Sequence, residues 1–236
     1  MKDKFVKIQD IMPSLSYTYE PLVIEKENKS LRIYYINRYQ NNKIKSAKFQ
    51  PKEANIPELF YFSTKIVELM GLYQGDGQKS TNSKSYQAVR FSNSIPALIK
   101  DCIKFLKLCN VNIKELKLYL RVRFKDKKLH SEEEIINYWS NALNFPKENI
   151  YKIQWVPAKT NKFYKFGTAT VIYGNSSFRL FFDALFNYTK QESIKKEEYA
   201  ISFLRGLIAA DGNVYWKNSN REVGIAAKFQ KDRDYC

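Results

Sequence analysis

Histidine and cysteine are scarce in this 236-residue chain, which has one histidine and three cysteines. The single histidine, His130, excludes a Ser-His-Asp triad unless that one residue serves in it, and it excludes a zinc site built on histidines. Cys102, Cys109 and Cys236 have no metal-ligand spacing and are odd in number, which predicts a reduced, intracellular and cytoplasmic protein. Any hydrolytic chemistry must therefore rest on carboxylates and a metal ion.

Long apolar runs are absent, and acidic residues are outnumbered. No apolar run approaches the roughly 20 residues that span a bilayer, and the segment MKDKFVKIQD has no signal-peptide core, so no membrane partner is expected. The chain has 40 lysine and arginine residues against 24 aspartate and glutamate residues, which gives a formal net charge of +16. Such an excess is typical of proteins that bind nucleic acid, although many lysine-rich surfaces are only solvated.

Glycine is rare, yet two apolar segments use it in the same pattern. The segment LMGLYQGDG ends at Asp76 and Gly77, and the segment LRGLIAADG ends at Asp211 and Gly212. The distance between them along the chain is that of a small domain. Apolar residues recur at helical spacing in both segments, which predicts two helices that end at Asp-Gly, with Gly77 in a left-handed cap.

Small residues lie four apart in both predicted helices: Gly71 and Gly75 in the first, Gly206 and Ala210 in the second. A glycine inside a helix costs about 1 kcal/mol relative to alanine, so these positions need a reason. Without side chains on that face, the two helices can pack backbone to backbone. Their aspartates would then meet where the partial negative charge of two helix C-termini favours a divalent cation. The alternative is two buried helices whose Asp-Gly is only a C-terminal cap.

The two segments resemble the signature motifs of the LAGLIDADG homing endonucleases, and GLIAADG is a close match. The resemblance implies an α+β fold of two pseudo-symmetric αββαββα halves, each with a saddle-shaped antiparallel sheet that straddles DNA. It implies that Asp76 and Asp211 bind Mg2+, with Mn2+ as a substitute, assisted by the backbone carbonyls of Gly75 and Ala210. The implied reaction is hydrolysis of phosphodiesters in both strands of a long double-stranded DNA site, as in intron homing.

The resemblance also implies residues that assist the metal. By order along the fold, Lys190 is the candidate for the basic residue that stabilises the charge developing on phosphate, and an ordinary solvated lysine is its alternative. Asn93, at the end of a predicted strand, is the candidate for positioning water. Gln74 and Ala209 stand where the family motif has a first, non-catalytic aspartate.

A predicted strand at residues 116–125 carries the strongest sign of nucleic-acid binding. Its apolar face begins at Leu116 and ends at Phe124. Its other face is basic and aromatic and consists of Lys117, Tyr119, Arg121, Arg123 and Lys125. A solvated strand face, the alternative, usually mixes charge signs, whereas arginine can bind guanine or phosphate through two hydrogen bonds. Two further strands, at residues 86–93 and 150–156, add three candidates for DNA binding: Arg90, Lys152 and Gln154.

Periodicity and capping residues predict the other elements. Helices are expected at residues 62–75, 96–108, 131–144, 178–188 and 199–210, with Ser63 or Thr64 capping the first and a capping box of Ser131 and Glu134 opening the third. Strands are expected at residues 22–24, 31–36, 165–173, 213–216 and 221–230. The order matches the family's half-domain with an insertion near residues 115–145.

These elements predict an N-terminal extension at residues 1–60, a first half-domain at 61–194 and the start of a second half-domain at 195–236. Too few residues follow Gly212 for another αββαββα half, so either the chain continues beyond Cys236 or the protein is a truncated relic. A complete second half would give a pseudo-symmetric monomer, and otherwise self-association through the motif helices is expected. The alternatives to an active endonuclease are a catalytically degenerate relic, a DNA-binding regulator and an RNA maturase. The target sequence, and whether the protein is intron-encoded, intein-derived or free-standing, stay open.

Overall fold

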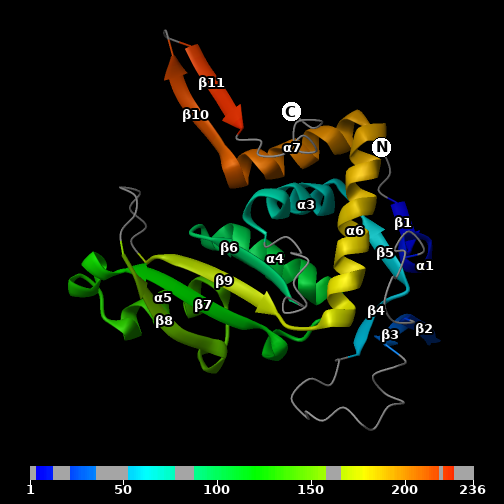
Figure 1. Ribbon diagram of the computed structural model, residues 1–236, viewed down its shortest axis with the longest axis horizontal. Coiled ribbons are helices and arrows are strands. Elements are labelled where there is room, and N and C mark those ends of the chain that lie inside the picture. The colour runs from blue at the N-terminus through cyan, green and yellow to red at the C-terminus, as the bar shows by residue number, and fades with distance from the viewer. Residues whose placement is uncertain are drawn as a thin grey trace. The chain divides into compact units, whose positions relative to one another are not determined.

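The computed structural model describes residues 4–12, 22–35, 53–77, 88–157, 166–217 and 220–225. The chain has an α+β fold and divides into two compact units (Figure 1). Residues Met1–Ser83 and Asn175–Cys236 make the first unit, and Lys84–Gly174 make the second. The boundaries expected from the sequence do not follow this division, because the N-terminal strands share a core with helices from distant parts of the chain. Parts of the predicted strands, at residues 36, 86–87, 165 and 226–230, lie outside the described residues.

The first unit combines N-terminal strands with three long helices. Its elements are β1 (Lys4–Lys7), α1 (Ile8–Ile11), β2 (Leu22–Glu27), β3 (Ser30–Tyr35), β4 (Ala54–Pro57), β5 (Leu59–Phe62), α3 (Thr64–Asp76), α6 (Ser176–Lys195), α7 (Glu197–Asp211), β10 (Gly212–Lys217) and β11 (Asn220–Ile225). β2, β3 and β4 form an antiparallel sheet, and β1 with β5 and β10 with β11 form antiparallel pairs. The N-terminal strands belong to the core, which includes their side chains Leu31, Ile33, Ile56 and Phe60.

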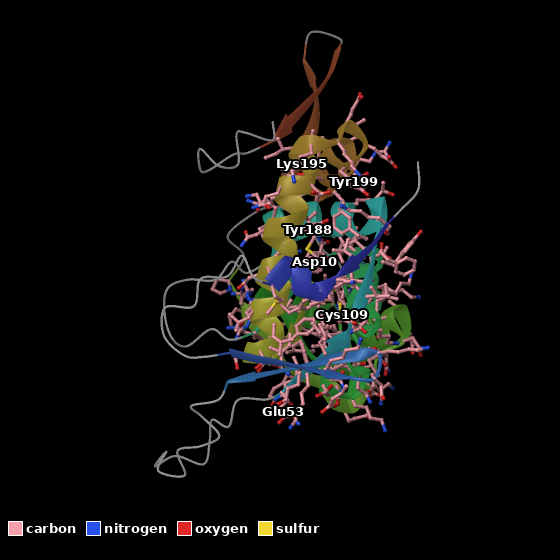
Figure 2. All side chains as sticks on the ribbon, turned by 90° about the vertical axis from the view of Figure 1, so that its right-hand side faces the viewer. Asp10, Glu53, Cys109, Tyr188, Lys195 and Tyr199 are labelled. Atoms are coloured by element: carbon pink, nitrogen blue, oxygen red, sulfur yellow. The ribbon has the colours of Figure 1, made fainter. Side chains whose placement is uncertain are left out.

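Helices α3 and α7 lie side by side and run in the same direction, and α6 crosses them (Figure 1). Ser63, one of the two predicted caps, precedes α3 in an extended conformation, although its side chain makes no capping hydrogen bond. Phe62 packs edge to face on Tyr188 of α6 and on Tyr199 of α7, with 5.3 Å between ring centroids in each pair. Figure 2 labels these two tyrosines. This aromatic cluster stabilises the place where the three helices meet.

The second unit is a four-stranded sheet with helices packed on its apolar face. Its elements are β6 (Val89–Asn93), α4 (Pro96–Leu108), η2 (Ile113–Glu115), β7 (Lys117–Arg123), η3 (Phe124–Lys128), α5 (Glu132–Leu143), η4 (Lys147–Asn149), β8 (Ile150–Val156) and β9 (Thr168–Tyr173). α4 and α5 contact the sheet and each other (Figure 1). Trp139 of α5 is fully buried, and its indole N–H donates to the carbonyl of Phe166 at 2.8 Å.

One strand pair departs from the antiparallel arrangement expected for this sheet. The strand order is β6-β9-β7-β8, and β9 is antiparallel to both β6 and β7, whereas β8 is parallel to β7. Parallel neighbours need a crossover connection, usually with a helix in it. α5 lies in the connection between β7 and β8. This crossover helix accounts for the parallel direction of β8.

Two residues have conformations that differ from the prediction. Phe124 lies in the turn η3, after the end of β7, and is 56% exposed instead of being on the apolar face. Gly77 ends α3 in an extended conformation (φ −82°, ψ 147°) instead of a left-handed cap. A Cβ atom at Gly77 would overlap the ring of Tyr73, so the approach of this ring, and not the backbone conformation, accounts for the glycine.

The observed helix ends show where local sequence signals predicted a helix boundary correctly and where they did not. The capping box of Ser131 and Glu134 is confirmed at the start of α5. α6 begins earlier than predicted because the side chain of Asn175 accepts a hydrogen bond from the backbone N–H of Phe178, at 2.9 Å. It also continues to Lys195, beyond the predicted end at residue 188. None of the described helices combines the length and apolar character that crossing a membrane would need.

Candidate functional site

Two glycines permit the close contact between α3 and α7. A Cβ atom at Gly71 would overlap the backbone carbonyl of Phe203 in α7. A Cβ atom at Gly206 would overlap the backbone carbonyl of Glu68 in α3. Real Cβ atoms essentially never come within 3.0 Å of such atoms, so only glycine permits this approach. The two contacts are equivalent, since Gly71 and Gly206 occupy the same position in the two motifs.

The motif aspartates lie at one end of this helix pair. Asp76 follows Gly71 by as many residues as Asp211 follows Gly206, and each is the last residue of its helix. Because α3 and α7 run in the same direction, both helices end on the same side of the glycine contact (Figure 1). Asp76 is half-buried, and the side chain of Asp211 lies outside the described residues.

The donors at this end suit a magnesium ion. Mg2+ is usually held by one or two carboxylates together with water and substrate phosphates, so it needs no larger protein cage. The last carbonyls of two helices add partial negative charge. Gly75 and Ala210, whose carbonyls are the predicted auxiliary ligands, are both half-buried. Within the described part of the chain, no three His, Cys, Asp or Glu residues are grouped as a metal site.

A buried polar network lies next to the first motif. Arg179 of α6 is 6% exposed and donates from Nη1 to the hydroxyl of Tyr73 at 2.9 Å. Its Nε and Nη2 lie 2.9 Å and 2.7 Å from the carboxylate of Asp183, one turn further along α6. Burial opposes the charged form of Arg179, but the hydrogen bonds to Asp183 and Tyr73 outweigh it and raise its pKa. Burial raises the pKa of Asp183, against the effect of Arg179.

Sequence reasoning did not identify this network. Its only signal is an arginine and an aspartate four residues apart in the aromatic segment RLFFDALF, where both would lie on one helix face. Charged residues on such a face indicate a buried pair. Tyr73 gives no signal of its own, because it fits the apolar pattern of the motif helix.

The outer face of the sheet in the second unit is basic and aromatic. Lys117, Tyr119 and Arg121 of β7 are exposed, and the residues between them are buried. Tyr119 stacks on Tyr151 of β8 with 4.9 Å between ring centroids and 8° between ring planes. Lys117 Nζ donates to the hydroxyl of Tyr151 at 3.3 Å. Gln154 is exposed and lies opposite Arg121 in the register of β7 and β8. These five residues are called the basic face below.

Other predicted DNA-binding residues have different surroundings. Arg123 is not exposed for DNA, because its side chain is 12% exposed and its Nε lies 2.7 Å from the buried carboxylate of Asp126. Arg90 of β6 is half-buried. Lys125 and Lys152 belong to η3 and β8, and their side chains lie outside the described residues.

Tyr151 belongs to the basic face although the sequence pattern did not select it. A register shift in the pairing of β7 with β8, between Leu118 and Leu120, interrupts the regular alternation of faces. Strict alternation along β8 therefore predicts the wrong face for the first residues of this strand.

The two predicted auxiliary residues have structural contacts. Lys190 is half-buried within α6 rather than after its end, and its Nζ lies 5.6 Å from the ring centroid of Phe186. Asn93 ends β6, and its side-chain oxygen accepts a hydrogen bond from the backbone N–H of Ile95 at 2.7 Å. This bond supports the turn into α4, a role that the prediction for Asn93 did not include.

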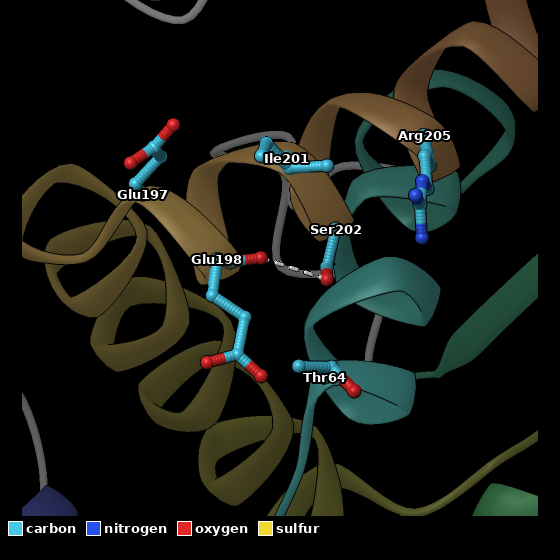
Figure 3. Close-up of a pocket in the computed structure, with 6 residues that line it drawn as sticks. All are labelled: Thr64, Glu197, Glu198, Ile201, Ser202 and Arg205. Atoms are coloured by element: carbon cyan, nitrogen blue, oxygen red, sulfur yellow. Dashed lines mark hydrogen bonds between the residues drawn. The ribbon is translucent and has the colours of Figure 1, made fainter. Parts of the chain in front are cut away.

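A cavity of about 410 Å³ opens at the other end of the helix pair (Figure 3). Its lining consists of Thr64, Glu197, Glu198, Ile201, Ser202 and Arg205. These residues come from the first turn of α3 and the first half of α7, so the cavity lies away from the helix ends that carry the aspartates. It contains none of the residues predicted for catalysis.

Comparison of the chain with protein-family models, with curated proteins and with solved structures finds no match.

Proposed function

We propose that this protein is a LAGLIDADG-type endonuclease that cuts double-stranded DNA at a specific long site with the help of Mg2+. The observation that carries the proposal is the glycine contact of α3 and α7. Beyond this contact, the two equivalent motif helices end in Asp76 and Asp211. Two helices that only pack in a core need no aspartate at their C-termini. A metal ion shared by the two helices needs one from each. The wider fold of the family, with a half-domain of αββαββα type, is part of the proposal.

The proposed mechanism assigns the two carboxylates to metal binding. Asp76 and Asp211 supply anionic oxygen ligands, and the carbonyls of Gly75 and Ala210 assist. When bound, Mg2+ lowers the pKa of a coordinated water and stabilises the leaving 3′ oxygen. That Lys190 neutralises the phosphate stays a prediction, and so does the role of Asn93 in positioning the water.

The proposed DNA contact uses the basic face. Lysine and arginine neutralise phosphates, and arginine and glutamine can form paired hydrogen bonds to guanine and adenine in the major groove. Arg121 and Gln154 are exposed neighbours on adjacent strands, which suits them to base readout. The stacked tyrosine pair and Lys117 form a cluster beside them.

Cleavage of a randomised duplex library tests the proposed function. We expect sequencing of the cut ends to recover one long site when Mg2+ is present, and no cut ends when EDTA removes it. Mn2+ should restore cutting. Cutting that persists in EDTA, or ends without a shared site, would contradict the proposal. A structured RNA bound in preference to duplex, without cleavage, would favour a maturase instead.

Arg121→Ala should raise the Kd for the cleaved duplex site by about 10-fold, since a paired arginine contact contributes about 1–3 kcal/mol. Fluorescence anisotropy at a fixed salt concentration measures this Kd. Arg32→Ala is the matched control, because Arg32 belongs to β3 and is paired with Glu53. Equal loss of affinity in both variants would mean that net charge, and not the basic face, determines binding.

A non-catalytic DNA-binding regulator is the second candidate function. The basic face belongs to the second unit, which has its own apolar core, and binding through it requires neither aspartate. The library experiment separates the candidates, because a regulator would enrich a bound site and leave it uncut with Mg2+.

A further inference from the structure

Tyr73 supports the end of α3 that carries Asp76. Its side chain is buried, at 4% exposed, one turn before Asp76. Its carbonyl accepts the backbone N–H of Gly77 at 2.9 Å, and its ring fills the space that a side chain at Gly77 would need. The peptide between Asp76 and Gly77 is therefore packed against Tyr73.

Tyr73 is in turn held by α6. Its ring packs edge to face on Phe182, at 4.6 Å between centroids, and on Phe186, at 5.8 Å. Its hydroxyl accepts the hydrogen bond from Arg179, whose guanidinium carbon lies 5.9 Å from the ring centroid. Ring packing limits tilting of the tyrosine, and the hydrogen bond fixes its position along the ring axis.

The guanidinium of Arg179 has a fixed direction. Two of its nitrogens bind the carboxylate of Asp183, which leaves Nη1 directed at Tyr73. A charged group in a core costs free energy even when it is paired, and an apolar side chain could fill the same space. A planar guanidinium with several fixed donors is suited to holding a partner in one place. The charge in this aromatic core therefore calls for a role beyond packing.

We propose that Arg179 is a positioning residue for Asp76, which acts through the hydroxyl of Tyr73 to fix the last turn of α3. That Asp76 is a metal ligand rests on the proposed function. That Arg179 fixes this helix end depends only on the contacts described above. The two parts can fail separately, and the experiment below distinguishes them.

Amide hydrogen exchange tests the structural part. In Arg179→Met and in Tyr73→Phe, we expect exchange at the amides of Asp76 and Gly77 to become about 10-fold faster, with the first turns of α3 unchanged. The double variant should match Arg179→Met, since Tyr73→Phe removes no further interaction with Arg179 once the guanidinium is gone. Arg32→Met, which removes an arginine–glutamate pair elsewhere in this unit, is the matched control and should change neither. Tyr73→Phe loses only one oxygen, so it keeps the test valid if Arg179→Met does not fold. Unchanged exchange in the folded variants overturns the proposal.

Cleavage kinetics test the consequence for the metal ligand. Loss of a residue that orients a metal ligand typically costs 10-fold to 100-fold in metal affinity or activity. We expect kcat to fall by that amount in both variants with KM unchanged, and the Kd for Mn2+, measured by water proton relaxation, to rise about 10-fold. Faster exchange with unchanged kcat and Mn2+ affinity would overturn the link to Asp76. If the wild-type protein cuts no DNA, the proposed function fails, and the exchange and Mn2+ results still decide the role of Arg179.

Discussion

Asp76→Asn and Asp211→Asn should each lower the rate of duplex cleavage on the order of a thousandfold or more. A bound metal contributes several kcal/mol to stabilising the transition state, and each 1.36 kcal/mol is a factor of ten in rate. An amide keeps the size of the carboxylate and removes the charge that is proposed to hold Mg2+. DNA affinity should stay nearly unchanged, because neither residue belongs to the basic face. Single-turnover cleavage and anisotropy measure the two effects on the same substrate.

Glu198→Gln provides the matched control for these variants. It makes the same change from carboxylate to amide on α7, but at the cavity by the opposite end of the helix pair. Its cleavage rate should equal that of the wild-type protein. An Asp76→Asn protein that cut at the wild-type rate would remove Asp76 from the mechanism. Equal losses in all three variants would indicate a general effect of charge on the helices.

The helix pair could be expected from the sequence because the signal appears twice. A single glycine in a helix has several explanations, but glycine at the same place in two motifs points to a shared contact. The structure packs Gly71 and Gly206 against the facing backbones. The alternation of β7 and the capping box of α5 were equally readable, since both depend on neighbours in the sequence.

Features that depend on residues far apart in the sequence could not be predicted from local sequence patterns. The direction of β8 follows from a helix inserted in the crossover, and the outward position of Tyr151 follows from a register shift with β7. Arg123 looks like a DNA contact by alternation alone, yet Asp126, in the turn after the strand, binds it. Arg179 and Tyr73 are 106 positions apart along the chain, and only the packing of α6 on α3 reveals their hydrogen bond.

Gly71→Ala and Gly206→Ala should each destabilise the protein by about 3 kcal/mol. In an ordinary helix, replacing glycine by alanine stabilises by about 1 kcal/mol, so the expected sign is reversed. The added methyl group would overlap a backbone carbonyl of the facing helix, which cannot rotate away as a side chain can. The helices must therefore separate, and overpacking of this kind costs about 1–3 kcal/mol or more.

Thermal unfolding measures the effect of these substitutions. A loss of about 3 kcal/mol lowers Tm by roughly 6–12 °C in a chain of this size. Gly174→Ala is the matched control, because no heavy atom lies within 4 Å of the Cβ it would add, and its Tm should stay within about 2 °C of the wild-type value. The contact also sets the distance between Asp76 and Asp211, so any folded Gly71→Ala protein should lose cleavage activity well below its Tm. A rise in Tm for Gly206→Ala would show that α3 and α7 do not meet at these glycines, and the proposed shared metal site would lose its structural basis.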